Sequence, residues 1–342
     1  MKSNLIVLLI CAFTGLSFTS ERVLSLLYPS HFPAPTYNLT DNPLLQESID
    51  LGQMLFYDPI LSKDYSISCA SCHSPYNAFA HTDHDLRHGF NDSIGTRNAP
   101  ALFNLAWQTS FMWDGAVNHL DMQSLAPLSH PSEMGENIKD VVEKLSNTMR
   151  YRTAFYNAWA DSLPTGERFL KSITQFQLTL ISATAKYDRV MAGNDVLSPQ
   201  EAMGYALFKD HCGSCHTEPL FSSYGFSKNG LPVNTTLDDY GRYRVTKNDE
   251  DSLLFKIPSL RNLSYTFPYM HDGRYLKLNE VLNHYNILAA GMIDDSALSR
   301  PMNLSSKDKV DLISFLMTLN DTAFVLNPQN KFPQSLQMRS KN

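Results

Sequence analysis

The sequence predicts a mostly α-helical protein made of two similar halves. Two stretches carry this prediction, because Cys69-Ala70-Ser71-Cys72-His73 and Cys212-Gly213-Ser214-Cys215-His216 both follow the pattern Cys-x-x-Cys-His. Apolar residues recur at helical spacing ahead of each motif, and strand-like runs are few. We therefore expect two cytochrome-c-like haem domains that are related by internal duplication.

The order of residues in each motif suits covalent haem attachment. Cys69 with Cys72, and Cys212 with Cys215, can each add to the two vinyl groups of one haem. The residue that follows, His73 or His216, then offers an imidazole nitrogen to the iron. A zinc site built from the four sulfurs would leave both histidines unexplained. A dithiol redox site would need a strand–helix context that neither stretch has.

Length and charge set broader limits. The chain has 342 residues, enough for two domains, and a net charge of −6 with no basic stripe, which excludes nucleic acid as a partner. Residues 1–20 resemble a secretory signal peptide, and Cys11 offers a less favoured lipidation site. We expect residues 21–190 and 191–342 to form the two haem domains of an exported, periplasmic protein that does not span the membrane.

Capping signals and periodicity place the main helices. Asn42-Pro43 is expected to start the helix that leads to the first motif, and Ser198-Pro199-Gln200-Glu201 the helix that leads to the second. Further helices are expected over 141–160, 169–190 and 307–319. A turn at 163–166 separates the first two of these, and 191–197 is the expected linker between the halves. The apolar face of 307–319 would cover the second haem.

The two halves share residues at constant spacing. Gly52, Leu55, Phe56 and Asp58 match Gly204, Leu207, Phe208 and Asp210 ahead of the motifs. Beyond the motifs, Pro100, Leu102, Asn104, Leu105, Met112, Asp114 and Gly115 match Pro258, Leu260, Asn262, Leu263, Met270, Asp272 and Gly273. A constant offset over seven identities indicates a duplication with one haem in each half.

Positions where the halves differ are candidates for function. Trp113 stands where the second half has His271, and it is either an oxidisable π-system or a packed core residue. Glu133 follows a proline-containing loop and suits a general acid–base group, although the residues alone favour a solvated surface glutamate. His81, His84 and His88 cluster between these features. One of them is a candidate ligand of the first haem, and with Asp83 and Asp85 they are a weaker candidate metal site.

Together these motifs resemble the bacterial di-haem cytochrome c peroxidases and their relative MauG, over roughly residues 43–320. The resemblance depends on both haem motifs and on five further stretches: 95–100, 113–115, 133–134, 258–262 and 268–273. It implies two covalently bound haem c groups, with the peroxidatic one in the first half.

The resemblance also implies roles for single residues. His73 would be the proximal ligand of the first haem and His88 its displaceable distal ligand, with His81 and His84 as rivals because the local spacing is two residues longer than usual. Glu133 would be the catalytic glutamate and Trp113 the electron relay between the haems. Asn98 and the carbonyl groups of Thr266 and Pro268 would hold one calcium ion, for which oxygen ligands are suitable.

One stretch departs from the peroxidase pattern. Within 278–285, Tyr285 stands where the peroxidases have the methionine ligand of the second haem, and MauG-type proteins have a tyrosine there. A phenolate ligand would stabilise ferric iron and lower the potential of the second haem. Met292 and Met302 remain alternative ligands, and Tyr285 could instead be a packed helix residue.

The sequence thus predicts a di-haem c-type peroxidase that reduces hydrogen peroxide with electrons from a small donor protein such as cytochrome c. A MauG-like oxidase acting on a protein or small molecule is the second hypothesis, and a non-catalytic di-haem electron carrier is the third. Family members are often dimers, so a homodimer is also expected, but no stretch identifies its interface.

Overall fold

The computed structural model describes residues 23–83, 86, 88–287 and 302–337. Helices dominate this part of the chain, as predicted, and its only strands are β1 (Phe226–Ser227) and β2 (Phe255–Lys256), which pair antiparallel. The predicted signal peptide lies outside the described residues. Within them, no helix is both long and apolar enough to cross a bilayer.

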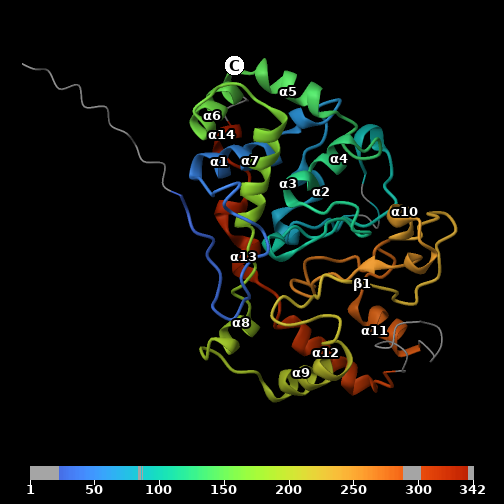
Figure 1. The fold of residues 1–342 in the computed structure, drawn as a ribbon. Coiled ribbons are helices and arrows are strands. Elements are labelled where there is room, and N and C mark those ends of the chain that lie inside the picture. Colours follow the sequence, from blue (N-terminus) through green and yellow to red (C-terminus); the bar gives the residue numbers. More distant parts are fainter. Residues whose placement is uncertain (1–22, 84–85, 87, 288–301, 338–342) are drawn as a thin grey trace, which may run out of the picture.

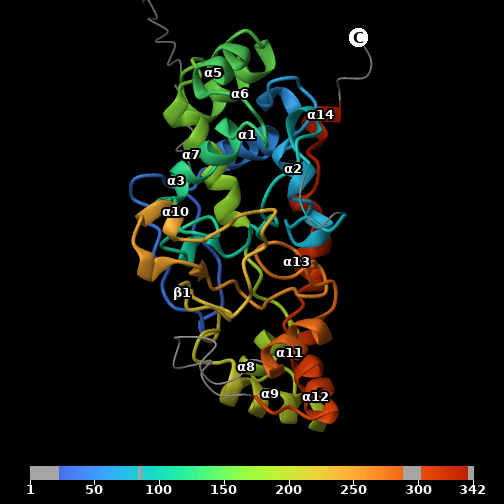
Figure 2. The same ribbon diagram turned by 90° about the vertical axis from the view of Figure 1, so that its right-hand side faces the viewer.

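The helices gather at two ends of the molecule (Figures 1 and 2). The first half contains α1 (Gln46–Tyr57), α2 (Cys69–Cys72), α3 (Leu120–Gln123), α4 (Leu125–Ser129), α5 (Ile138–Ser146), α6 (Met149–Trp159), α7 (Gly166–Thr179) and α8 (Lys186–Met191). The second half contains α9 (Pro199–His211), α10 (Tyr243–Thr246), α11 (Leu278–Ile287), α12 (Ser306–Met317), α13 (Thr322–Leu326) and α14 (Gln334–Gln337). Although α13 and α14 come last in the chain, Phe324, Val325 and Leu336 are buried in the core of the first half.

The helix signals near the second motif are confirmed. Ser198 caps α9, with Glu201 completing the capping box and Pro199 as the first helical residue. Ser305 caps α12 in the same way, with Asp308. The expected apolar face of α12 is buried, and it packs against α9. This pair of helices therefore frames the second haem motif at the end of α9.

Three helix boundaries differ from the prediction. The first helix begins at Gln46 rather than at Pro43, because the Asn42 side chain instead bonds to Gln175 and to the Lys171 carbonyl. The predicted helix 141–160 is two helices, α5 and α6, with Thr148 in an extended conformation between them. The predicted helix 169–190 is likewise divided into α7 and α8.

The break between α7 and α8 has a tertiary cause. Asn104 donates its backbone N–H to the Leu180 carbonyl (2.9 Å), and its side chain bonds the backbone of Ser182 at both ends. These bonds use the backbone groups that a continuous helix would pair internally. The chain therefore crosses the first core as an extended segment before it turns into α8.

Each half has one tight helix crossing at an equivalent glycine. A Cβ atom on Gly52 of α1 would lie 1.9 Å from the Ser172 carbonyl oxygen of α7. On Gly204 of α9 it would lie 1.9 Å from the Asp311 carbonyl oxygen of α12. Only glycine permits this approach. The helix before each haem motif is thus positioned by the same backbone contact.

Turns beyond the motifs also match between the halves. Met112 and Met270 have φ of 68° and 73°, and Gly115 and Gly273 have φ of 70° and 71°. Phe111 pairs with Val117 across the first turn, and Tyr269 pairs with Tyr275 across the second. The sequence identities at these positions therefore correspond to the same local backbone conformation.

Ion pairs join the halves around the first of these turns. Arg97 binds Asp114 of its own half (2.6 Å) and Asp239 of the second half (2.5 Å), and all three side chains are largely buried. Arg242 of the second half donates to the Asp114 carbonyl (3.1 Å). This network fixes the segment 239–242 against the turn that carries Trp113.

Candidate haem sites and the cavity between them

The first Cys-x-x-Cys-His motif forms one turn of helix and the residue that follows it. Cys69 and Cys72 are the ends of α2, and His73 is its C-terminal cap. The Nδ1 atom of His73 lies 2.8 Å from the Phe79 carbonyl oxygen. Because a carbonyl oxygen can only accept, Nδ1 carries the proton and Nε2 presents a lone pair. His73 is therefore held in the form that ligates a metal.

The second motif repeats this arrangement at the end of α9. The Nδ1 atom of His216 lies 3.2 Å from the Phe221 carbonyl oxygen and 3.0 Å from that of Pro258. Burial lowers the pKa of His216 to about 4, so the imidazole is neutral at neutral pH. Both histidines thus direct Nδ1 at a backbone carbonyl, which leaves Nε2 for iron ligation.

The cysteines do not fit a zinc or dithiol site. No disulfide joins Cys69 to Cys72 or Cys212 to Cys215. Burial raises the pKa of the Cys69 and Cys212 thiols to about 12, whereas thiol redox chemistry needs a thiolate. Among the described residues, no three His, Cys, Asp or Glu side chains converge as metal ligands. The two separate cysteine pairs fit thioether attachment of one haem each.

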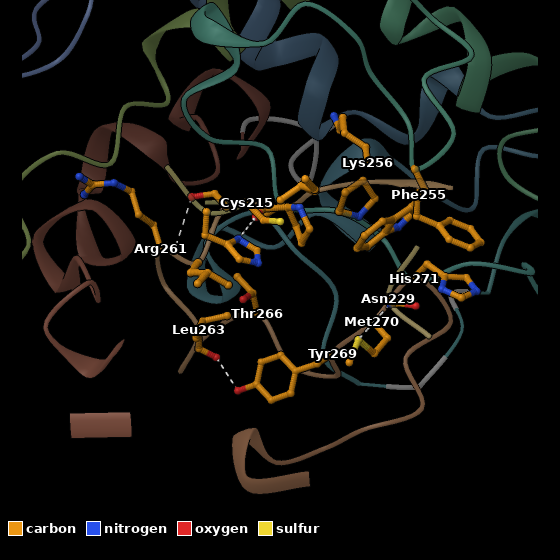
Figure 3. A pocket seen from close by; sticks show the side chains of 18 of the residues that line it. Cys215, Asn229, Phe255, Lys256, Arg261, Leu263, Thr266, Tyr269, Met270 and His271 are labelled. Atoms are coloured by element: carbon orange, nitrogen blue, oxygen red, sulfur yellow. Dashed lines mark hydrogen bonds between the residues drawn. The ribbon is translucent and has the colours of Figure 1, made fainter. Parts of the chain in front are cut away.

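A cavity of about 260 Å³ extends from the second motif towards the first half (Figure 3). It is lined by Cys212, Cys215 and His216 from the motif and by apolar residues of α11 and α12, including Leu282, Leu312 and Leu316. Its other lining residues include Trp113 and the segments 98–103 and 255–261. One continuous space therefore connects the second motif with the tryptophan that the sequence singles out.

Tyr285 lies in this cavity together with the second motif. It is close enough to Cys212 and Cys215 for their charges to influence its phenol, and burial raises the pKa of that phenol. Met302 lines the same cavity and stays an alternative ligand. Met292 lies outside the described residues. Tyr285 thus lies on α11 and borders the cavity that contains the second motif, and its role as a ligand stays a prediction.

Glu133 and His88 come together beside the first motif. The backbone N–H of Phe90 donates to the Glu133 carbonyl (2.5 Å), and a Cβ on Gly89 would lie 2.2 Å from the Ser132 carbonyl oxygen. The Glu133 side chain is 12% exposed, which argues against the solvated-surface interpretation. The structure therefore seats the predicted carboxylate in a tight loop against the segment that carries His88.

The three candidate histidines have different positions. The His88 carbonyl oxygen lies 3.9 Å from the Cys72 sulfur, whereas its ring Nδ1 bonds the exposed Asp92 at 2.6 Å. His81 is buried, at 8% exposure. His84 lies outside the described residues. The His88 backbone thus adjoins the first motif, and so does the residue before His81, because Ala80 pairs with Ser74.

Trp113 is tied to both halves. Its indole N–H donates to the Asn98 carbonyl (2.8 Å), and its own carbonyl accepts from the backbone N–H of Lys256 (2.7 Å). Asn98 in turn donates its side-chain N–H to the Pro268 carbonyl (2.6 Å). Thr266 lines the cavity beside them. Asn98 and Pro268 thus contact each other directly, and the calcium site stays a prediction.

Several cavity residues were not identified from the sequence. Gln123 is buried and accepts a hydrogen bond from Gln177 (3.1 Å), and Lys256 borders the cavity from β2. The His271 ring stacks on Phe255 with 3.7 Å between ring centres, as Figure 3 shows. None of these residues has a motif around it that signals a site. The one available signal was that His271 stands in the position equivalent to Trp113.

Comparison with known proteins identifies the class to which this site belongs. A model of the di-haem cytochrome c peroxidase family matches residues 46–196. The methylamine utilization protein MauG of Methylorubrum extorquens is 36% identical over 84% of this chain and 82% of its own length. The cytochrome c551 peroxidase of Nitrosomonas europaea is 33% identical over 93% of this chain and 92% of its own.

The solved structures agree with the sequence relatives. A crystal structure described as a MauG-like protein associated with microbial copper homeostasis superposes with a TM-score of 0.80. It shares 27% identity and covers 91% of this chain and 99% of the other. The chain belongs to the di-haem cytochrome c peroxidase family, which includes MauG. The family implies two haem c groups, and the two histidine–cysteine sites fit them.

Proposed function

We propose that this protein is an exported, periplasmic di-haem peroxidase that reduces hydrogen peroxide to water with electrons from a small donor such as cytochrome c. The observation that carries the proposal is the pair of imidazoles, His73 and His216, each oriented by a backbone carbonyl beside two cysteines. Relatives named cytochrome c peroxidase support the choice of substrate and donor.

We propose that the two halves, domains 21–190 and 191–342, arose by internal duplication. Each half would bind one haem through its own residues. Cys69, Cys72 and His73 would hold the first haem, and the second motif would do the same for the second haem. When bound, the haem iron supplies the electron-transfer chemistry and the binding site for peroxide. The protein supplies the axial ligands and the proton donors.

Glu133 is proposed to move the protons. Reduction of peroxide to two waters consumes two protons, so a carboxylate at the peroxide site must be protonated again in each cycle. His130 Nδ1 lies 3.8 Å from Glu133 Oε1, and the His130 side chain is 52% exposed. His130 therefore offers Glu133 a connection to solvent. His88, on the adjacent segment, would be the displaceable ligand at the peroxide site.

Trp113 is proposed to relay electrons between the halves. Its indole N–H is bonded to Asn98, so it does not need a water partner, and the ring borders the cavity that contains the second motif. Asn98, Thr266 and Pro268 are proposed to hold one calcium ion at this junction, which would stiffen the contact between Trp113 and the second half. A homodimer stays a prediction.

Substitution of Glu133 tests the proposal directly. Glu133→Gln keeps the shape but removes the acid–base group, and we expect it to slow peroxide reduction about 10²- to 10⁴-fold. Glu143→Gln makes the same change at an exposed position of α5 and serves as the control. Stopped-flow spectra after peroxide addition would measure the rate. Equal rates in the two variants would exclude the proposed role, and no reaction of the wild type with peroxide would exclude peroxidase activity.

A MauG-like oxidase is the second candidate, and Tyr285 is the observation that favours it. The phenol shares the cavity with the second motif, and a phenolate ligand would disfavour electron entry from ordinary cytochrome c. Electron paramagnetic resonance of the ferric protein should then change in Tyr285→Phe. The same spectrum should be unaffected by Tyr275→Phe, a neighbouring phenol outside the cavity lining. Rapid turnover with ferrocytochrome c would favour the peroxidase instead.

A further inference from the structure

Lys256 is a cationic side chain at the junction that the proposed mechanism does not use. It lies on β2 and borders the cavity, and Figure 3 shows it at the opposite end of the cavity from Tyr269. Its Nζ atom donates to Gln108 Oε1 (2.6 Å) and to the Ser110 carbonyl (3.0 Å). The amine therefore reaches from the second half into the first.

Both of these partners are neutral, which leaves the ammonium charge without a bound carboxylate. Asp114 is the carboxylate that acts on Lys256 through its charge, but its Oδ2 atom is already bound to Arg97 at 2.6 Å. Burial lowers the pKa of Lys256 to about 7. A buried cation needs an anion as a partner, or it loses its proton. The two hydrogen bonds use two of the three ammonium hydrogens of Lys256, and the Phe111 ring, 5.7 Å from Nζ, supplies no anion.

The cavity itself indicates which anion fits. Haem c is attached through its vinyl edge, and the opposite edge carries two propionate carboxylates. The two cationic residues of the cavity lining that lie beyond the motif are Lys256 and Arg261. The Arg261 guanidinium is already held by both carboxylate oxygens of Asp188 (2.8 and 2.7 Å) and by the Pro219 carbonyl. Lys256 is the cation that remains for a carboxylate.

We propose that Lys256 binds a haem propionate at the junction of the two halves. This inference rests on the proposed function, because it requires haem at the motifs. The contact would link three parts of the site, since the Lys256 backbone bonds Trp113, its amine bonds Gln108 and Ser110, and its charge would meet the cofactor. Neutralising a propionate favours the ferrous state, so Lys256 would also raise the potential of that haem.

The potentials of both haems test this assignment. Spectroelectrochemical titrations of the holoprotein would compare wild type, Lys256→Met and Lys256→Arg. We expect the methionine variant to lower the potential of one haem and to shift its propionate bending mode in the resonance Raman spectrum. The arginine variant, which keeps the cation, should restore both properties. Lys144→Met is the control, because Lys144 is bound to Glu136 (2.6 Å) in the first half and does not line the cavity.

The outcomes separate this inference from the proposed function. If Lys256→Met binds two haems with unchanged potentials and an unchanged Raman band, the propionate contact is excluded while the peroxidase proposal stands. If the wild type binds no haem, the proposed function fails first and this inference fails with it. If the methionine variant does not accumulate as a folded holoprotein, Lys256→Gln with the Raman measurement decides the question in the same way.

Discussion

At the crossing of α9 and α12, a glycine-to-alanine substitution should change the free energy of unfolding through two opposing effects, steric overlap and helix propensity. Gly204→Ala adds a Cβ that would lie 1.9 Å from the Asp311 carbonyl oxygen and 2.9 Å from the Phe315 Cβ. The first obstacle is backbone, so the two helices must separate. Overpacking of this kind costs up to about 3 kcal/mol, whereas alanine favours a helix over glycine by about 1 kcal/mol, which leaves a net loss of about 2 kcal/mol.

Denaturant unfolding of the holoprotein would measure this loss. Ala206→Gly is the matched control, because Ala206 is exposed on the same helix and its substitution changes helix propensity alone. We expect that control to lose about 1 kcal/mol. We also expect Gly204→Ala to shift the visible spectrum of the second haem, since α9 ends at Cys212. A Gly204→Ala variant more stable than wild type would refute the tight crossing.

Further predictions concern the contacts around the first haem and the junction. Gly89→Ala would push the His88 segment away from Glu133 and should slow the reaction with peroxide by on the order of 10²-fold, as measured by stopped flow. Arg97→Met leaves the buried Asp114 without its cation and Asp239 with only the more distant Arg244 (3.6 Å), and it should cost about 3–5 kcal/mol in denaturant unfolding. Burial opposes the charge on Asp239, but the hydrogen bond and charge of Arg97, together with the Gly241 N–H and the charge of Arg244, outweigh burial and lower the pKa of Asp239. The stabilisation from Asp239 should therefore be complete above about pH 4 and lost as the pH falls further, and Arg97→Met should reduce this loss in acid titrations.

Local signals in the sequence were sufficient for much of the fold. The haem motifs, the capping box at Ser198 and the matching glycines all have effects that act within a few residues or at one helix crossing. Asn42 shows where such reasoning fails. Its sequence context is typical of a helix start, but its side-chain oxygen accepts a hydrogen bond from Gln175, which lies 133 residues away in the sequence. Tertiary bonds of this kind leave no periodic pattern.

The residues of the candidate site also differ in whether local sequence patterns could predict them. Cys, His and Glu residues could be proposed because their chemistry is specific and their neighbours form recognisable patterns. Gln123 and Lys256 became candidates only when the fold placed them on one cavity. A lysine in a short strand is ordinarily a solvated residue, and only the loss of water around its amine makes it informative. The sequence does not contain the burial that creates this condition.

The divergence between Trp113 and His271 now has a structural basis. Asn98 lies between the two equivalent turns, because its carbonyl accepts from the Trp113 indole while its backbone N–H donates to the His271 carbonyl (2.7 Å). His271 contributes a backbone group to this contact, so its ring is available to stack on Phe255. Trp113 contributes its side chain, which holds the indole across the junction. If both turns carried the same residue at this position, they could not make these two different contacts. The difference between Trp113 and His271 therefore gives the junction one redox-capable ring, the indole, with a fixed orientation.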